Sequence, residues 1–182
     1  ALPSTTAALL QTLDTPNSYD SRHNSLNGTL GARCTIWLGG KLPNQHITFT
    51  PTVNGSIERL TYRRDALHAH PRRNQLFFLP TLSWGFDNCH ITYRMHAAYP
   101  ELFNLLDYTD NADPLNLYCG NPHLQRSTSH KVTFSRSWWK WKEGKKFFID
   151  AAWDVTRNAV AHGQTYDAAT GVRTFMPRNV DG

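Results

Sequence analysis

The chain has 182 residues and a formal net charge of +5, and 40% of its residues are hydrophobic and 18% charged. This composition suits one folded domain over residues 1–182 and excludes a disordered chain, because enough apolar surface can be buried to offset the ordering entropy. Apolar runs such as residues 76–79 end after four or five residues, far below the about 20 residues of a membrane-spanning helix, so no membrane span is expected.

The first half of the chain is predicted to consist mainly of short strands. In chain order we expect a helix at 6–13, a loop at 14–30, strands at 34–38, 46–50 and 56–63, and an exposed loop at 64–75 that contains Pro71. Asn54-Gly55 is a tight-turn signal. The strand at 56–63 should therefore pair back on the strand at 46–50 as a hairpin.

The second half contains the clearest strand pattern, from Cys89 to His96, where apolar and polar residues alternate. Around it we expect a strand at 76–79, a helix at 101–108, a strand at 131–141, a turn at 143–144, a helix from Phe147 to His162, and a final hairpin made of 164–166 and 172–176. The late helix is predicted because Ile149, Trp153 and Val160 share one helical face and Gly163 can end it.

These elements predict a mainly β, or β-rich α+β, fold. Two antiparallel sheets would pack as a sandwich, with the late helix from Phe147 to His162 on one side. A β-trefoil is the alternative; the length favours it, whereas the absence of a threefold repeat opposes it.

Several features indicate an extracellular protein. The chain begins at Ala1 without a methionine, which predicts a removed signal peptide. Asn27 and Asn54 each begin an Asn-Gly-Ser/Thr triplet, the acceptor for glycosylation in an exposed turn. Cys34, Cys89 and Cys119 allow one disulfide, predicted between Cys89 and either of the others, with one thiol left free.

The most conspicuous candidate binding segment interleaves aromatic and basic residues, which can stack on bases or sugars and neutralise anions. Its members are Trp138, Trp139, Lys140, Trp141, Lys142, Lys145 and Lys146. The preferred interpretation is structural, with one tryptophan in the core and the lysines on a solvated hairpin tip. A binding surface is the alternative.

No catalytic residue, metal site or cofactor is predicted. A Gly-x-Ser-x-Gly elbow is absent from the sequence, and His68-Ala69-His70 supplies only two metal ligands. A metal-free ribonuclease is the strongest enzyme reading, because His90, Arg94 and His96 share the polar face of the clearest strand.

The Trp84-Gly85 pair before Cys89-His90-Ile91, followed later by Ile149-Asp150-Ala151-Ala152-Trp153, resembles small secreted proteins of filamentous fungi. The resemblance covers about a third of the chain and implies a released effector, but no catalytic residue. The chain lacks the cysteine that ends the late helix in those proteins.

We therefore expect a secreted, extracellular binding or effector protein that engages an extracellular host protein and inhibits a hydrolase such as a protease. Arg72 and Arg73 follow Pro71 in a predicted stiff loop, which would lose little entropy on entering a cleft. A secreted ribonuclease and a glycan-binding module that uses the Trp/Lys segment are the alternatives; nucleic acid and glycan are the less favoured partners.

Overall fold

The computed structural model describes residues 19–64 and 67–181. This part of the chain forms the strands β1 (Asp20–Gly31), β2 (Cys34–Trp37), β3 (His46–Thr50), β4 (Thr52–Arg64), β5 (Leu67–Ala69), β6 (Arg72–Phe78), β7 (Thr81–Phe86), β8 (Cys89–Ala98), β9 (Thr109–Asp113), β10 (Asn116–Cys119), β11 (Ser127–Lys140), β12 (Lys145–Arg157), β13 (Ala159–Tyr166) and β14 (Arg173–Val180), and the 3₁₀ segments η1 (Leu102–Leu105) and η2 (Trp141–Glu143). The structure thus confirms a mainly β fold of open antiparallel sheets, consistent with the predicted sandwich-like arrangement.

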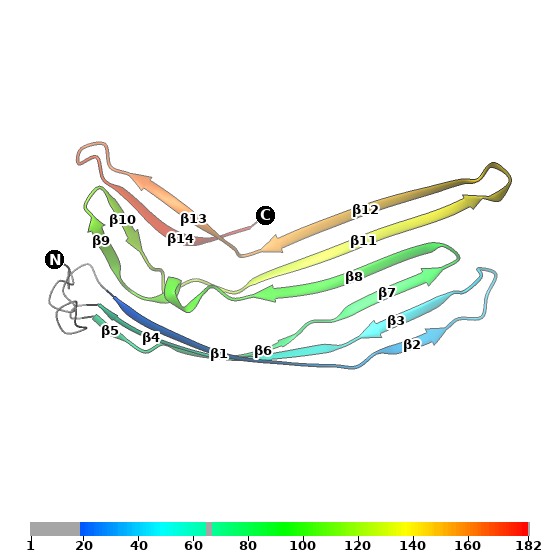
Figure 1. Ribbon diagram of the computed structural model, residues 1–182, viewed down its shortest axis with the longest axis horizontal. Coiled ribbons are helices and arrows are strands. Elements are labelled where there is room, and N and C mark those ends of the chain that lie inside the picture. The colour runs from blue at the N-terminus through cyan, green and yellow to red at the C-terminus, as the bar shows by residue number, and fades with distance from the viewer. Residues whose placement is uncertain (1–18, 65–66, 182) are drawn as a thin grey trace, which may run out of the picture.

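The strands β1 to β8, β11 and β12 form one long meander. The strand order is β12-β11-β8-β7-β3-β2 in one sheet, and β4 lies between β1 and the strands β5 and β6 in another. The two sheets continue each other, because β1–β4 and β2–β3 share one antiparallel register, as do β4–β6 and β3–β7. Figure 1 shows the consequence: β1 runs into β2, and β6 runs into β7.

Two prolines explain why the long strands are divided. Pro51 separates β3 from β4, and Pro80 lies between β6 and β7. Proline has no amide hydrogen and interrupts the ladder on its donor side. Its carbonyl still accepts, since the backbone nitrogens of Ala32 and Met95 donate to Pro51 and Pro80 at 3.2 Å. The register therefore continues through both positions.

A smaller sheet has the order β13-β14-β10-β9, in which β10 and β14 are parallel. It follows β12 at Asn158, whose φ of 53° lies in the left-handed region. Asn tolerates this conformation better than most residues. This residue ends the β11–β12 ladder and redirects the chain into β13.

The main buried cluster lies at one end of the meander. It consists of Leu60 and Tyr62 of β4 with Leu102 of η1 and Leu106, which directly follows η1, all at most 5% exposed. The connection between β8 and β11, residues 99–126, therefore covers one side of the sheet at this end. No helix in the described ranges is long and apolar enough to cross a membrane.

The predicted helix from Phe147 to His162 is wrong. Residues 145–157 form β12 and pair along their whole length with β11, from Lys140↔Lys145 to Thr128↔Arg157. The same residues that suggested a helical stripe also alternate with a period of two, and the ladder with β11 satisfies every second backbone group. Gly163 lies inside β13 and does not cap a helix.

Other local predictions also fail in the first half. Asn54-Gly55 lies inside β4 between β1 and β6, where Gly55 has no positive φ, so it forms no hairpin turn. The predicted loop at 14–30 contains β1, and the one at 64–75 contains β5 and part of β6. The helix expected at 101–108 is only η1. The strands at 34–38 and 46–50 are confirmed as β2 and β3, whereas the helix at 6–13 lies outside the described residues.

The predicted disulfide is not formed. Cys34 is exposed, Cys89 is buried, Cys119 is half-buried, and all three are free thiols. Cys34 on β2 is separated from Cys89 on β8 by β3 and β7. Three strand spacings amount to about 14 Å, about twice the longest Cα separation that a disulfide tolerates. Cys119 belongs to the other sheet.

Candidate functional site: a two-faced sheet

The register of the meander sorts its side chains onto two faces. Residues directly opposite each other on paired strands project to the same side, and successive residues on a strand project to opposite sides. The pairs Ile47↔Trp84, Trp84↔Ile91 and Ile91↔Phe134 therefore place four large apolar side chains in one row. Each row of cross-strand partners can be assigned to one of the two faces in this way.

We call one side the apolar face. It carries Leu26, Leu30, Cys34 and Ile36 of β1–β2, Ile47, Phe49, Val53 and Ile57 of β3–β4, Leu76, Phe78, Leu82, Trp84 and Phe86 of β6–β7, Cys89, Ile91, Tyr93 and Met95 of β8, Val132, Phe134 and Trp138 of β11, and Phe147, Ile149, Ala151, Trp153 and Val155 of β12. These side chains form a broad apolar surface across six long strands, which His130 and Arg136 of β11 interrupt.

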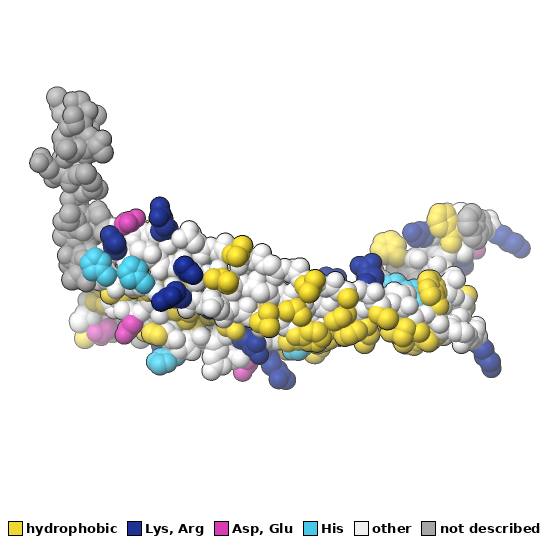
Figure 2. Space-filling model, turned by 90° about the horizontal axis from the view of Figure 1, so that it is seen from below, with side chains coloured by type: hydrophobic (Ala, Val, Ile, Leu, Met, Phe, Trp, Pro, Cys, Tyr) yellow, Lys and Arg dark blue, Asp and Glu magenta, His cyan; other side chains and the backbone are white. Residues whose placement is uncertain are grey.

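Much of this surface is exposed. Leu30 is 78% exposed, Leu76 is 73% exposed and Trp153 is 60% exposed. In a folded chain in water, contiguous apolar patches of this kind are rare and mark contact with a partner or a membrane. Figure 2 shows hydrophobic side chains gathered along the middle and right of the molecule, whereas Lys and Arg side chains lie at both of its ends.

The opposite side is the polar face. Its side chains include Thr35, Thr48, Ser83, Thr92, Arg94, His96, Ser129, Lys131, Thr133, Ser135, Asp150 and Asp154, and Ser21, His23, Ser25, Asn27, Asn54, Ser56, Glu58, Arg73 and Gln75 toward the other end. Aromatic exceptions near the far end are Trp37, Trp139 and Phe148. Leu60, Tyr62 and Phe77 also lie on this face, where they are buried. Outside these positions the two faces differ in chemistry along the meander.

The apolar spans have a constant length. On the first three long strands they run over residues 26–36, 47–57 and 76–86. Each covers about 33 Å along the strand at about 3.3 Å per residue. With a tilt of about 40°, this corresponds to a height of about 25 Å, the height of the apolar band on membrane strands.

The Trp/Lys segment forms the tip of the β11–β12 hairpin. Trp138 and Lys140 lie on the apolar face, whereas Trp139 and Lys146 lie on the polar face, as the period of two requires. The carboxylate of Glu143 lies 3.5 Å from the Lys140 ammonium and 3.3 Å from that of Lys145. Lys142 and Trp141 belong to the η2 turn. Trp138 is 38% exposed and Trp139 is 50% exposed, so neither of these two side chains anchors a core.

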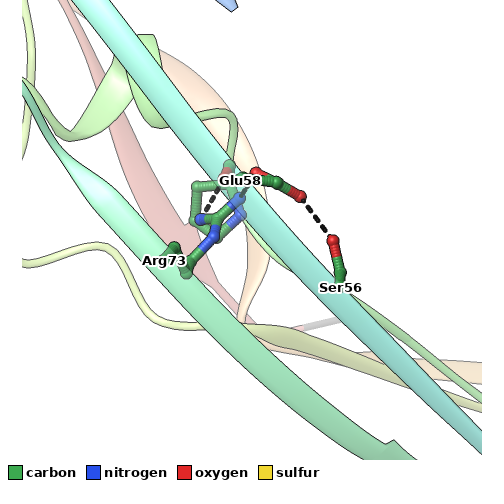
Figure 3. Close-up of polar contacts among 4 residues, drawn as sticks. Ser56, Glu58 and Arg73 are labelled. Atoms are coloured by element: carbon green, nitrogen blue, oxygen red, sulfur yellow. Dashed lines mark hydrogen bonds and ion pairs between the residues drawn. The ribbon is translucent and has the colours of Figure 1, made fainter. Parts of the chain in front are cut away.

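The two arginines predicted to lie in a binding loop are separated by the sheet. Arg72 and Arg73 belong to β6, so Arg72 projects on the apolar side and Arg73 on the polar side. Arg73 donates to the Glu58 carboxylate at 2.6 Å and to the carbonyl of Pro100 at 2.5 Å. Its guanidinium also lies 5.0 Å from the centre of the Tyr99 ring. Figure 3 shows the polar contacts of Arg73 and Glu58, including the hydrogen bond that Ser56 donates to Glu58 at 3.2 Å.

The network and the buried cluster together hold residues 99–126 against the polar face. A second ion pair, between Arg64 of β4 and Asp110 of β9, has a distance of 2.7 Å. The backbone amide of Ala112 and then the Arg64 guanidinium lower the pKa of Asp110 below its ordinary value. Burial beside Tyr62 and Asp110 raises the pKa of Tyr108 to about 12.

The residues considered for nuclease or metal chemistry are not assembled into a site. His90, Arg94 and His96 do share the polar face, as predicted, and their cross-strand partners on β11 are Ser135, Lys131 and Ser129. The His90 ring also lies 5.8 Å from the ring of His46. His68 lies on β5, and the described residues contain no group of three or more metal-ligating side chains.

The sequons also lie in paired strands, Asn27 on β1 and Asn54 on β4, where the buried side-chain oxygen of Asn54 has no hydrogen-bond partner. The expectation of exposed turns at these sites is therefore wrong.

The largest set of residues that sequence reasoning missed is the apolar face of β1 and β4. The signal was present as the spacing of Leu26 and Leu30, and of Val53 and Ile57, with small or polar residues between them. Gly28 and Gly55 stand opposite each other in the middle of this pattern and conceal the alternation.

Comparison with known proteins agrees with this geometry. Residues 58–182, more than half of the chain, match the model of a family described as the outer membrane protein beta-barrel family. No curated protein and no solved structure shows a significant match to the chain. The match is compatible with a location outside the cell or in its envelope, and it concerns a family other than the small secreted fungal proteins. The chain belongs to the outer membrane protein β-barrel family.

Proposed function

We propose that the meander forms part of the wall of an outer-membrane barrel, with the apolar face toward lipid and the polar face toward a water-filled interior. The observation that carries this proposal is the register itself, which gives six neighbouring strands an exposed apolar side and a polar side. Membrane strands require this alternation, because lipid solvates one side and water the other.

The length of the apolar spans supports the same proposal. A tilted membrane strand needs about 9–11 residues, and residues 26–36, 47–57 and 76–86 each provide a span of this length. Charged residues lie toward both ends of the band: Arg59 follows Ile57 on the apolar face of β4, and on β11 Arg136, in the row of Phe86, and Lys140 lie on that face. The side chains on this face thus change from apolar to charged where a membrane–water boundary would lie.

The edges of the sheet fit a wall that other strands complete. In the described part of the chain, β1–β2 and β12 are edge strands of the meander. An open edge is costly in lipid, since its amide and carbonyl groups have no water to bind. Further strands would pair with these edges and leave the polar face, with residues 99–126 folded against it, inside the wall.

Tryptophan fluorescence tests which face contacts lipid. Trp84 and Trp153 lie on the apolar face, whereas Trp37 lies on the polar face. The chain has six tryptophans. We would prepare three variants that each keep one of these three tryptophans and carry phenylalanine at the remaining five positions, and reconstitute them in vesicles that contain brominated phospholipids. Strong quenching of Trp84 and Trp153 with weak quenching of Trp37 is expected.

Equal quenching at all three positions, or none, would overturn the proposal. Circular dichroism of each variant gives the control for β structure. Binding of a host protein and inhibition of a protease by the chain stay separate predictions. Release of the chain as a free secreted protein is the alternative to a location in the cell envelope.

A further inference from the structure

A pair of opposed arginines lies immediately beyond the apolar band. Arg59 of β4 and Arg72 of β6 are direct cross-strand partners, and both side chains are exposed on the apolar side of the sheet. Asn24 of β1 lies opposite Arg59 on its other side. Two like charges placed opposite each other in a sheet repel and destabilise it.

No described carboxylate compensates this repulsion. Neither arginine takes part in an ion pair within residues 19–64 and 67–181. Glu58 precedes Arg59 but projects to the polar face, where Arg73 binds it. On the polar face the comparable pair of cations, Arg94 and Lys131, does have an acid in its row, because Asp154 lies opposite Lys131. An anion bound between Arg59 and Arg72 would therefore offset a repulsion that no described side chain offsets.

The shape at this position suits an anion. A hollow of about 300 Å³ is lined by Arg59, Arg72 and Asn74. Two guanidinium forks can each donate a pair of hydrogen bonds to phosphate oxygens, and the Asn74 amide adds a further donor. Arg22 lies on the same side one row away and raises the positive potential, whereas Arg63, two rows away, has Asp20 opposite it.

The location identifies the source of the phosphate. The next row toward the middle of the sheet contains Leu26 and Ile57, with which the apolar spans of β1 and β4 begin. If the apolar band lies in the hydrocarbon layer, the arginines lie at the depth of the lipid headgroups. We propose that Arg59 and Arg72 form a binding site for the phosphate of an anionic lipid headgroup; this inference rests on the proposed function.

Vesicle binding of the full chain tests the site. We would compare vesicles of phosphatidylcholine alone with vesicles that also contain phosphatidic acid, using the chain and its R59Q/R72Q variant. Removal of two cations at a membrane surface should weaken binding to the phosphatidic acid vesicles by about thirtyfold. Binding to phosphatidylcholine alone should change little.

The matched control is R94Q/K131Q, which removes the same charge from the polar face and should bind both vesicles like the unmodified chain. An equal loss in the two double variants would overturn the proposal, because net charge alone would then explain the effect. Displacement of the chain by inorganic phosphate at the concentration of the lipid phosphate would overturn the assignment to a lipid.

The failures of the two proposals are distinguishable. If the chain binds neither kind of vesicle, the membrane wall itself is refuted. If it binds both kinds equally and R59Q/R72Q has no effect, only the phosphate site is refuted. Circular dichroism of each variant shows whether β structure is retained, so that a folding defect is not mistaken for lost binding.

Discussion

Arg73 of β6 and Glu58 of β4 form an ion pair of 2.6 Å in which neither side chain is more than 18% exposed. The same guanidinium donates to the carbonyl of Pro100, near the start of the segment that lies on the polar face. One side chain thus connects two strands of the wall to residues 99–126. The remaining donor of Arg73, Nε, is buried without a partner, so the arrangement depends on the two contacts that are made.

Replacement of Arg73 by Met should release the 99–126 segment. The variant leaves the Glu58 carboxylate unpaired and partly buried, and removal of one partner of such a pair costs about 3 kcal/mol. Hydrogen exchange of residues 99–108 should accelerate, whereas R72M, on the opposite side of the same strand, should leave it unchanged. Unchanged protection in R73M would show that the buried cluster alone holds the segment.

Substitution of Gly120 by Ala should also destabilise this region. A β carbon at Gly120 would collide with the backbone carbonyl of Leu106, which cannot rotate away as a side chain could. A loss of about 2 kcal/mol or more in the free energy of unfolding is expected, as for other overpacked sites.

Gly28, on β1, supplies the control, since a β carbon there meets nothing within 4 Å. G28A should therefore match the unmodified chain or exceed its stability slightly, because alanine restricts the unfolded chain. If G120A unfolds at the same denaturant concentration as G28A, the close packing of residues 106 and 120 is not a constraint on stability.

The pKa of Tyr108, raised to about 12, predicts a loss of stability at high pH. The ordinary pKa of tyrosine is 10.0, and folding favours the neutral phenol because burial penalises the phenolate. Stability from this group is complete below pH 10 and falls as the pH rises from about 10 through 12. Unfolding curves recorded across this range should show the decline in the unmodified chain and a smaller one in Y108F. An identical decline in both would assign it to other groups.

Adjacent residues of β7 allow a direct comparison of the two faces. Leu82 lies on the apolar face and Ser83 on the polar face. In lipid, L82R should cost about 2–4 kcal/mol, because arginine near the middle of a bilayer loses its hydration. S83R should cost less than about 1 kcal/mol, since the polar face is solvated. The measurement is the free energy of unfolding from vesicles, and equal costs would contradict a lipid contact restricted to one face.

The absence of long apolar runs led to the prediction of no membrane span, but the length of apolar runs does not test strands. A strand buries only every second side chain in lipid, so the apolar residues of a membrane strand never form a run. The pattern Leu26, Leu30, Val53 and Ile57 is of this kind. Runs of four or five residues are therefore compatible with the proposed membrane wall.

The sequence by itself determined that the chain is mainly β, and it located strands where alternation is strong, as from Cys89 to His96. It could not determine β12, because the residues from Phe147 onward fit both a helix of period 3.6 and a strand of period two. Only the ladder with β11 decided between them, since it supplies thirteen cross-strand partners that a helix would forgo.

The two faces were also decided by the tertiary structure. Alternation within one strand says that its two sides differ, but not which sides of neighbouring strands coincide. The register fixes this, because a shift of one residue would move every apolar side chain of that strand to the polar face. The pairing of Arg59 with Arg72 arises in the same way, from residues thirteen positions apart that no local pattern connects.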